Sequence, residues 1–305
     1  MAHDRTDLTF PSGGDEVAAW LYRPGTGDDP RIPCIVMAHG FSATRAEALP
    51  AYAERFADAG FGVVLFDYRG FGDSGGEPRQ VIDIRRQQED YEAAIRFACR
   101  QPWVDPERIA LFGSSFSGGH VVDIASRDGR IAAVIAQAPF ADGLAQLRIT
   151  PPGIAARATL DGLRDLLAAA RGRAPVTIRA TGAPGSYAVM TAPEAEPGFA
   201  SIVGSDSRWE NAVGARIMLF VGSWRPVVKA RNVRAPLLVC VCDADQTTPP
   251  GPAVQMALNA PRGEVVHYPI GHFDVYTGED FERAVTDQLA FLRRVLVPAV
   301  VGTPA

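Results

Sequence analysis

The sequence predicts an α/β fold: a mostly parallel sheet with helices on both faces, interrupted by an inserted unit. Short, nearly continuous apolar runs alternate with longer stretches of helical periodicity. Such runs are typical of strands buried on both faces, and the alternation is typical of strand–helix–strand units. One connection of roughly ninety residues, far longer than the usual few, predicts the insertion.

The elements of the predicted core follow one another in a regular order. The N-terminal runs Leu8–Phe10 and Glu16–Tyr22, joined by Pro-Ser-Gly-Gly, predict a hairpin. The remaining predicted strands are Ile32–Ala38, Gly62–Phe66, Ile109–Phe112, Ile131–Ala136, Leu237–Val241 and Val265–Tyr268. The predicted helices are Ala46–Ala59, Ile84–Cys99, Gly118–Ser126, Pro252–Asn259 and Asp280–Leu296.

We expect residues 1–139 and 232–305 to form the core and residues 140–231 to form a cap domain over one edge of the sheet. Within the insertion, Ala155–Ala170 carries Leu160, Leu163 and Leu167 at helical spacing, and we expect this leucine stripe to be buried against the rest of the cap. The other elements expected in the insertion are a small hairpin from Val176–Ala180 and Tyr187–Met190 and a helix over Arg208–Val221.

Composition excludes several classes of partner. The chain has 30 Lys and Arg against 35 Asp and Glu, a formal net charge of −5, which provides no basic surface for nucleic acid. No apolar run approaches the roughly 18–20 residues of a membrane span, and the N-terminus lacks the apolar core of a signal peptide. We therefore expect a cytoplasmic protein with neither nucleic acid nor membrane as a partner. The sequence leaves a homodimer open.

The four cysteines are expected to act as small core hydrophobes. Cys34, Cys240 and Cys242 fall in predicted strands and Cys99 falls in a predicted helix. No His/Cys pair near them completes a zinc set, and no Gly-x-Gly-x-x-Gly opens a helix after a strand. No metal and no cofactor are therefore expected.

The most informative segment is Ile-Ala-Leu-Phe-Gly-Ser-Ser-Phe-Ser-Gly-Gly, residues 109–119. A strand that ends in a tight turn before a helix pushes a serine hydroxyl out at the end of a parallel sheet. Such a turn needs small residues two positions before and after the serine, and Gly113 and Ser117 meet this need around Ser115. Ser117 is an alternative nucleophile, flanked in the same way by Ser115 and Gly119. Because the strand ends at Phe112, we favour Ser115.

An aspartate and a histidine follow later strands in the order that such a serine would need. A hydroxyl requires an imidazole to take its proton, and the imidazole requires a carboxylate to fix its tautomer. His272 lies just beyond Val265–Tyr268, in Pro-Ile-Gly-His-Phe-Asp, and Asp245 follows Leu237–Val241. Asp243 competes with Asp245, which we favour because it leaves room for the chain to turn after Cys242.

The expected oxyanion hole consists of two backbone N–H groups. One belongs to Phe116, directly after the nucleophile, and the other to Phe41, in the loop His39-Gly-Phe-Ser after an early strand. Gly40 would let that loop approach closely. We expect His39 to organise the loop through hydrogen bonds rather than to take part in catalysis.

These residues resemble the α/β-hydrolase superfamily along most of the chain. Asp67-Tyr-Arg-Gly-Phe-Gly-Asp-Ser-Gly-Gly-Glu-Pro-Arg and Trp103-Val-Asp-Pro-Glu-Arg-Ile are similar to segments of its esterases and peptidases related to dienelactone hydrolase and X-prolyl dipeptidyl peptidases. The resemblance implies the α/β-hydrolase fold and a serine hydrolase that forms an acyl-enzyme on Ser115. It is specific for this chemistry and not for the substrate.

We expect a carboxylesterase acting on a small or medium ester. The alternatives are a thioesterase, a peptidase, and a non-hydrolytic lyase or ligand-binding protein of the same fold. A peptidase that captures a free amine would need carboxylates such as Glu194 and Glu196 to face the pocket. Residues of the cap expected to line an acyl or alcohol pocket are Tyr187, Met190 and Trp209.

Overall fold

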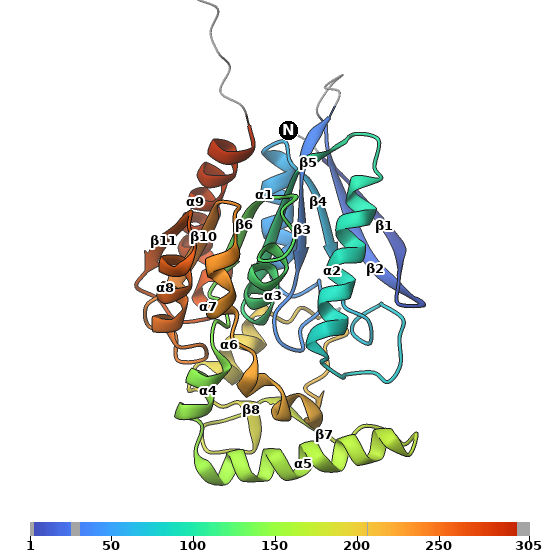
Figure 1. Cartoon of the computed structure of the whole chain (residues 1–305), viewed down its shortest axis with the longest axis vertical. Coiled ribbons are helices and arrows are strands. Elements are labelled where there is room, and N and C mark those ends of the chain that lie inside the picture. Colours follow the sequence, from blue (N-terminus) through green and yellow to red (C-terminus); the bar gives the residue numbers. More distant parts are fainter. Residues whose placement is uncertain (1–2, 26–30, 206, 298–305) are drawn as a thin grey trace, which may run out of the picture.

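The computed structural model describes residues 3–25, 31–205 and 207–297, and within them the chain builds an eight-stranded sheet. Its strand order is β1-β2-β4-β3-β5-β6-β10-β11 (Figure 1). The hairpin of β1 (His3–Ser12) and β2 (Asp15–Pro24) forms one edge and pairs antiparallel with β4 (Gly62–Phe66). All later pairings are parallel, between β4, β3 (Ile32–Ala38), β5 (Val104–Ser114), β6 (Ile131–Gln137), β10 (Leu237–Cys242) and β11 (Gly263–Tyr268).

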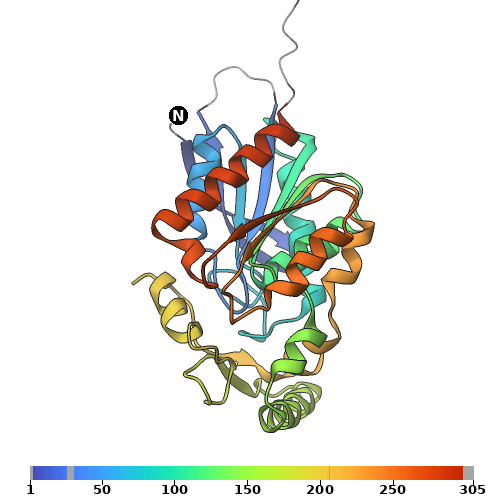
Figure 2. The same cartoon turned by 90° about the vertical axis from the view of Figure 1, so that its left-hand side faces the viewer.

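Helices cover both faces of the sheet, as Figures 1 and 2 show. The helices α1 (Leu49–Asp58) and α9 (Gly278–Leu296) share an apolar cluster with one face. The opposite face packs on α2 (Ile84–Cys99), α3 (Phe116–Ala125) and α8 (Pro250–Asn259). Successive residues of each strand enter opposite clusters, such as Ile35 in one and Val36 in the other, because side chains alternate along a strand. The α/β fold expected from the sequence is confirmed.

The expected strands are all present, but β1 and β5 each begin five residues earlier than expected, and β5 continues two residues past Phe112 to Ser114. The helix α1 is shorter than expected. This helix begins at Leu49, three residues later than expected, because Ala48 adopts a left-handed backbone conformation with φ 59°. A helix cannot continue through such a residue. Cys34, Cys240 and Cys242 are buried and Cys99 is half-buried, and all four are free thiols. Among the described residues, no helix is both long enough and apolar enough to cross a membrane.

The insertion between β6 and β10 lies at the end of the molecule where the parallel strands finish (Figures 1 and 2). Its helices are α4 (Gly143–Ile149), α5 (Pro152–Ala170), α6 (Ala195–Ile202) and α7 (Pro226–Lys229). Its strands β8 (Ala188–Met190), β7 (Thr177–Thr181) and β9 (Val213–Gly214) form a second sheet in that order among the described residues.

Two expectations within the insertion are wrong. β7 and β8 do not form a hairpin, because they pair parallel, with Arg179 opposite Ala188, while β9 is the antiparallel neighbour of β7. The segment 208–221 is not one helix; it contains β9, a 3₁₀ helix over Ala215–Leu219 and the start of another. The reason lies in its amides, since Gly214 N–H donates to Gln80 O at 2.7 Å and Ala215 N–H to Val176 O at 2.8 Å. Amides bonded outside the segment cannot build a continuous α-helix.

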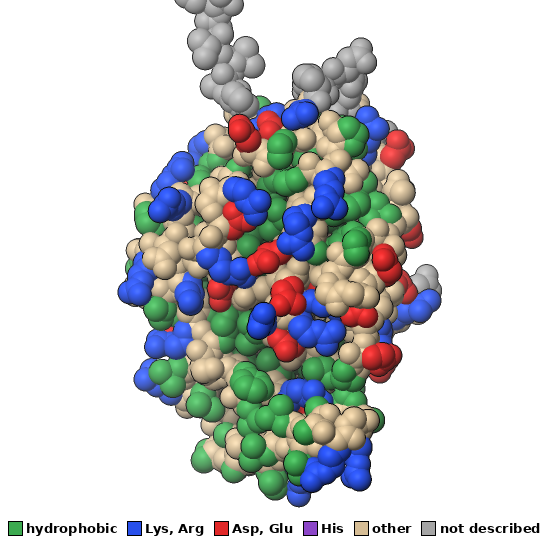
Figure 3. Space-filling model, turned by 45° about the vertical axis from the view of Figure 1, so that its right-hand side comes forward, with side chains coloured by type: hydrophobic (Ala, Val, Ile, Leu, Met, Phe, Trp, Pro, Cys, Tyr) green, Lys and Arg blue, Asp and Glu red, His purple; other side chains and the backbone are tan. Residues whose placement is uncertain are grey.

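The expectation that the leucine stripe of α5 is buried is also wrong. Leu160, Leu163 and Leu167 are 48, 53 and 54% exposed, whereas Asp165 on the opposite side is fully buried. Hydrophobic side chains accordingly lie at the surface at this lower end of the molecule (Figure 3). The Asp165 carboxylate accepts two hydrogen bonds from the Arg216 guanidinium, at 2.7 and 2.8 Å, and one each from the N–H groups of Val176 and Arg216, both at 2.9 Å. These bonds turn the polar face of α5 inward.

We predict that Asp165→Ala lowers the free energy of unfolding by about 3 kcal/mol, because it leaves a largely buried guanidinium and two amides without an acceptor. Leu163→Gln, on the exposed face of the same helix, should change that free energy by less than about 0.5 kcal/mol. Urea denaturation of both variants measures the difference. A larger loss for Leu163→Gln would show that the leucine stripe packs against part of the same molecule.

Candidate active site

Ser115 occupies the sharp turn between β5 and α3. Its backbone has φ 56° and ψ −121°, a conformation that residues other than glycine rarely adopt. The turn is held by three backbone hydrogen bonds: Ser115 N–H donates to Gln137 O at 2.8 Å, and Ser115 O accepts from the N–H groups of Gly118 at 2.9 Å and Phe140 at 2.8 Å. At Gly113 a Cβ would lie 2.2 Å from the carbonyl oxygen of Ser117, so the turn requires glycine there.

His272 and Asp245 meet this serine from the loops after β11 and β10. The Nε2 atom of His272 lies 3.1 Å from Ser115 Oγ, and its Nδ1 lies 2.6 Å from Asp245 Oδ2. The other Asp245 oxygen accepts from the N–H groups of Thr247 at 2.8 Å and Thr248 at 2.7 Å. Thr248 Oγ1 also donates to Asp245 Oδ2 at 2.8 Å. The carboxylate is thus fixed on both oxygens.

The environment favours the protonated form of His272. Burial by itself would lower the pKa of this imidazole, but the adjacent Asp245 carboxylate, through its charge and its hydrogen bond, outweighs burial, and the charge of Glu194 adds to its effect. The pKa of His272 is therefore raised above its usual 6.5. An imidazole so placed can take a proton from Ser115 and stabilise the resulting positive charge against Asp245.

The geometry separates the alternatives that the sequence left open. Ser117 is fully buried beneath the turn, where its hydroxyl hydrogen-bonds with Tyr91 at 2.6 Å and Tyr68 at 3.2 Å. Asp243 pairs at 2.7 Å with His267, and both of these side chains are about half exposed at the surface. The structure thus brings His272 to Ser115 and Asp245, and neither Ser117 nor Asp243 contacts it.

The two residues expected to supply the oxyanion donors, Phe41 and Phe116, lie next to Ser115. Within the described part of the chain, the N–H groups of Phe41 and Phe116 donate no hydrogen bond, and both residues line a cavity next to Ser115. The loop that carries Phe41 approaches closely because of Gly40, where a Cβ would lie 2.8 Å from Ser115 Cβ. His39 hydrogen-bonds through Nδ1 to Gly40 O at 3.0 Å. Burial lowers the pKa of His39 to about 3, so it is neutral and organises this loop.

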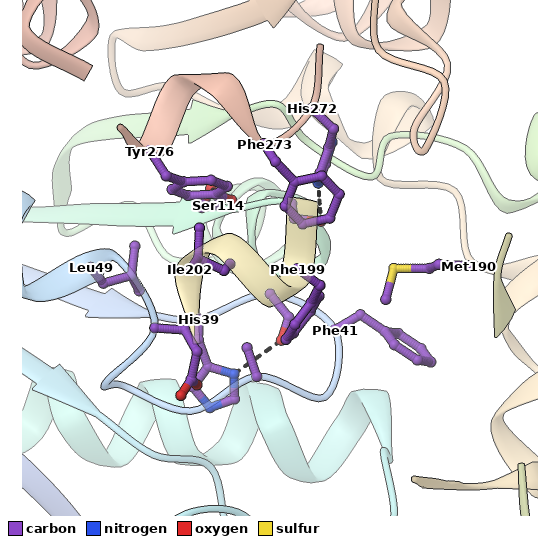
Figure 4. A pocket seen from close by; sticks show the side chains of 14 residues that line it. His39, Phe41, Leu49, Ser114, Met190, Phe199, Ile202, His272, Phe273 and Tyr276 are labelled. Carbon is purple, nitrogen blue, oxygen red and sulfur yellow. Dashed lines mark hydrogen bonds between the residues drawn. The ribbon is translucent and has the colours of Figure 1, made fainter. Parts of the chain in front are cut away.

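Two cavities meet at Ser115. The smaller, about 30 Å³, is lined by His272, Phe273, Tyr276, Phe199 and others, and Figure 4 shows these rings gathered with Met190 around it. The larger, about 80 Å³, lies beneath the insertion. It is lined mainly by apolar residues: Phe41, Phe116, Phe140, Ile154, Ala158, Ile178, Met190, Met218 and Val221.

The three expected pocket residues have different surroundings. Met190 borders both cavities, and Tyr187 borders the larger one while its hydroxyl donates to Asp161 at 2.7 Å. Trp209 lines neither cavity; it stacks on Phe199 at 4.5 Å between ring centroids. The sequence analysis did not identify Thr248, which donates hydrogen bonds to Asp245 from both its N–H and its hydroxyl group. An aspartate in a loop commonly accepts a hydrogen bond from a backbone N–H two residues later, and the Asp-Gln-Thr-Thr segment after β10 is a recognisable signal of such a turn.

Glu194 and Glu196 do not face the larger cavity as a peptidase of the expected kind would need. Glu196 pairs with Arg179 at 3.0 Å near the surface. Glu194 accepts hydrogen bonds from the loops that carry Asp245 and His272. Neither carboxylate is left for the amine of a substrate.

Comparisons with known proteins identify the family and the fold of the chain. A family model described as X-Pro dipeptidyl-peptidase (S15 family) matches residues 13–183. The quorum-quenching protein AidA of Acinetobacter baumannii is 41% identical over 290 residues, which cover 95% of each chain. The thiohydrolase aneE of Aspergillus aculeatus is 40% identical over 119 residues, 39% of this chain and 37% of that protein. The solved α/β hydrolase GrgF of Penicillium has the same fold, with a TM-score of 0.80 at 24% identity, covering 97% of this chain and 100% of that one.

The hydrogen-bond geometry makes a prediction about the reactivity of the Ser115 hydroxyl. Asp245→Asn should slow the reaction of Ser115 with a fluorophosphonate by about 10³-fold or more, because the amide no longer holds His272 in the tautomer that accepts a proton. Asp243→Asn is the matched control and should leave the rate unchanged. In the unmodified protein the rate should rise with pH through an apparent pKa above 6.5, since only neutral His272 accepts the proton. Equal losses in both variants would contradict this assignment.

Proposed function

The chain belongs to the X-Pro dipeptidyl-peptidase (S15) family of α/β-hydrolases, and on this premise we propose that it is a serine hydrolase that cleaves carboxylic esters through an acyl-enzyme on Ser115. The observation that carries the proposal is the continuous set of hydrogen bonds from Ser115 Oγ through His272 to Asp245. Such a relay activates a hydroxyl as a nucleophile at neutral pH.

In the proposed reaction, Ser115 Oγ attacks the ester carbonyl while His272 Nε2 takes the hydroxyl proton. The negative charge that develops on the carbonyl oxygen is bound by the free N–H groups of Phe41 and Phe116. His272 then returns the proton to the departing alcohol oxygen as the acyl-enzyme forms. In the second half a water molecule attacks the acyl-enzyme as it loses a proton to His272 Nε2. The bond between the acyl carbon and Ser115 Oγ then breaks, and His272 returns the proton to Oγ, which releases the acid and restores the serine hydroxyl.

The position of His272 determines which cavity holds the alcohol side of the ester and which holds the acyl side. The leaving oxygen must lie near Nε2 to receive the proton, so the alcohol side belongs in the smaller cavity, which His272 lines. The acyl side then extends into the apolar cavity of about 80 Å³. The limited size of this cavity restricts the length of the acyl chain that it can hold. We propose that residues 140–231 act as a cap on the core of residues 1–139 and 232–305 and select short to medium acyl chains.

A thioester is the second candidate substrate. The same relay would expel a thiol, and one relative carries the name thiohydrolase. A peptidase has less support, because Glu194 and Glu196 are both engaged elsewhere. A non-hydrolytic lyase or ligand-binding role has less support as well, since the hydrogen bonds that join Ser115, His272 and Asp245 form the arrangement that acyl transfer to a serine needs.

Replacement of the two serines tests the proposed nucleophile. Ser115→Ala should lower kcat/KM for nitrophenyl esters by roughly 10⁴-fold or more. It should also prevent the increase in protein mass that a fluorophosphonate causes by labelling Ser115. Ser117→Ala is the matched control; it should keep the labelling at Ser115, since Ser117 contacts tyrosines below the turn. A labelled, active Ser115→Ala protein would refute the nucleophile. If the protein hydrolyses an acyl thioester but no oxygen ester, its substrate is a thioester and not a carboxylic ester.

The direction of the acyl chain is tested by Ala158, which lines the larger cavity from α5. Ala158→Leu should shorten the preferred acyl chain of nitrophenyl esters, because the added carbons occupy the far part of this cavity. Ala156→Leu, on the exposed side of the same helix, should leave the preference unchanged. The measurement is kcat/KM for acyl chains of increasing length. If the unmodified protein and both variants prefer the same acyl chain length, the proposal that the acyl chain lies in this cavity is contradicted.

A further inference from the structure

We propose that Glu194, contributed by the insertion, is a positioning residue that holds the loops of Asp245 and His272 in register. The insertion would then serve proton transfer at Ser115 as well as shape the substrate pocket. This inference rests on the proposed function, because it assigns Glu194 to the same relay.

The Glu194 carboxylate joins the two loops through four hydrogen bonds. Its Oε1 accepts from the N–H of Gln246 at 2.7 Å, from the N–H of Thr247 at 3.0 Å and from the Thr247 hydroxyl at 3.0 Å. Its Oε2 accepts from the N–H of His272 at 3.1 Å. Hydrogen bonds from amides to a carboxylate are stronger than those to a neutral acceptor. One side chain therefore fixes the backbone on both sides of the Asp245–His272 contact.

The hydrogen bonds of Glu194 connect the two loops where the backbone pairing that extends from β10 and β11 has ended. The β10–β11 register stops at Cys242 opposite Tyr268. Two further backbone bonds follow: Asp243 N–H donates to Tyr268 O at 2.8 Å, and the last bond joins Ala244 N–H to Ile270 O at 3.0 Å. Beyond it the loops diverge and no longer pair directly through their backbones among the described residues. The bridge by Glu194 begins at this point. Without it, the amides of Gln246 and His272 would have no protein acceptor.

The surroundings of Glu194 fit it closely. At Gly271 a Cβ would lie 2.4 Å from Glu194 Oε2, so the residue before His272 leaves the space that the carboxylate occupies. The helix α6, which Glu194 precedes, packs on the neighbouring residue Phe273 through Phe199, with ring centroids 6.0 Å apart. Gly198 permits this approach, since a Cβ there would lie 2.4 Å from the Phe273 ring. Glu194 is thus held against the histidine loop by packing as well as by hydrogen bonds.

The charge of Glu194 also acts on His272. The carboxylates nearest this imidazole are Asp245, from the loop after β10, and Glu194, from the insertion, while Asp274 lies two residues further along its own loop. The other titratable groups that share its cavity are His39, Glu47 and Tyr276. Removal of the Glu194 charge should lower the pKa of His272, because a negative group that favours the imidazolium is lost.

Three variants of Glu194 separate its charge from its geometry. Glu194→Gln keeps the size of the side chain, but its single amide oxygen cannot accept hydrogen bonds from Gln246 and from His272 at the same time. Glu194→Asp keeps the charge but is too short to reach both loops. Glu194→Ala removes the charge and the hydrogen bonds. We expect kcat for a short nitrophenyl ester to fall by about tenfold in the first two and about 100-fold in Glu194→Ala, with KM within about twofold. Glu196→Gln, two residues further on and paired with Arg179, is the matched control and should behave like the unmodified protein.

A pH titration distinguishes positioning from general stability. The NMR resonance of the His272 ring proton, followed in Ser115→Ala protein so that no turnover is needed, should titrate at lower pH after Glu194→Gln and should not shift after Glu196→Gln. A normal kcat and an unshifted titration in folded Glu194→Gln and Glu194→Ala would overturn the inference. A rise in KM alone would overturn it too, since that would mean that Glu194 shapes only the pocket. The proposed function fails separately, if the unmodified protein neither labels at Ser115 nor hydrolyses any ester or thioester.

Discussion

The backbone conformation at Ser115 is the constraint on which the rest of the site depends. A left-handed residue between a strand and a helix is strained, and it persists only where its surroundings hold it. Gly113 and Gly40 leave the space for it, while Gln137 and Phe140 bond its peptide groups. Among the described residues, the same turn leaves the Phe116 N–H, at the N-terminus of α3, without a hydrogen-bond partner. One turn therefore positions both the Ser115 hydroxyl and the N–H group that we propose as an oxyanion donor.

The parallel sheet supplies the remaining groups. Because parallel strands end at one edge, the loops after β3, β10 and β11 bring Phe41, Asp245 and His272 to that turn. Two buried side chains there, those of Asp245 and His39, are held by hydrogen bonds that suit their roles. Asp245 is bonded on both oxygens, and His39 is neutral and fixes the peptide of Gly40. Little freedom is left to the groups that would move a proton.

The insertion is joined to this site through polar contacts as much as through apolar packing. Glu194 reaches the loops after β10 and β11, and Ser207 hydrogen-bonds with Glu47 in the loop after β3. Its helix α5 is turned with the carboxylate of Asp165 inward and its leucines outward. The arrangement places the segment that shapes the larger cavity in direct contact with the loops that carry the site.

The sequence by itself determined the order of the strands and helices and the positions of Ser115, Asp245 and His272 at strand ends. These features are local: apolar runs mark buried strands, and a glycine before a serine marks a tight turn. Only the tertiary structure decided which aspartate meets His272, how β7 and β8 pair, and which face of α5 is buried. Those outcomes depend on partners distant in the chain, such as Arg216, 51 residues beyond Asp165, and His272, 78 residues beyond Glu194. No local pattern encodes such partners. The buried face of α5 carries Asp165, paired with Arg216, together with the small residues Ala158 and Gly162, and it is not the face that the leucine spacing predicts.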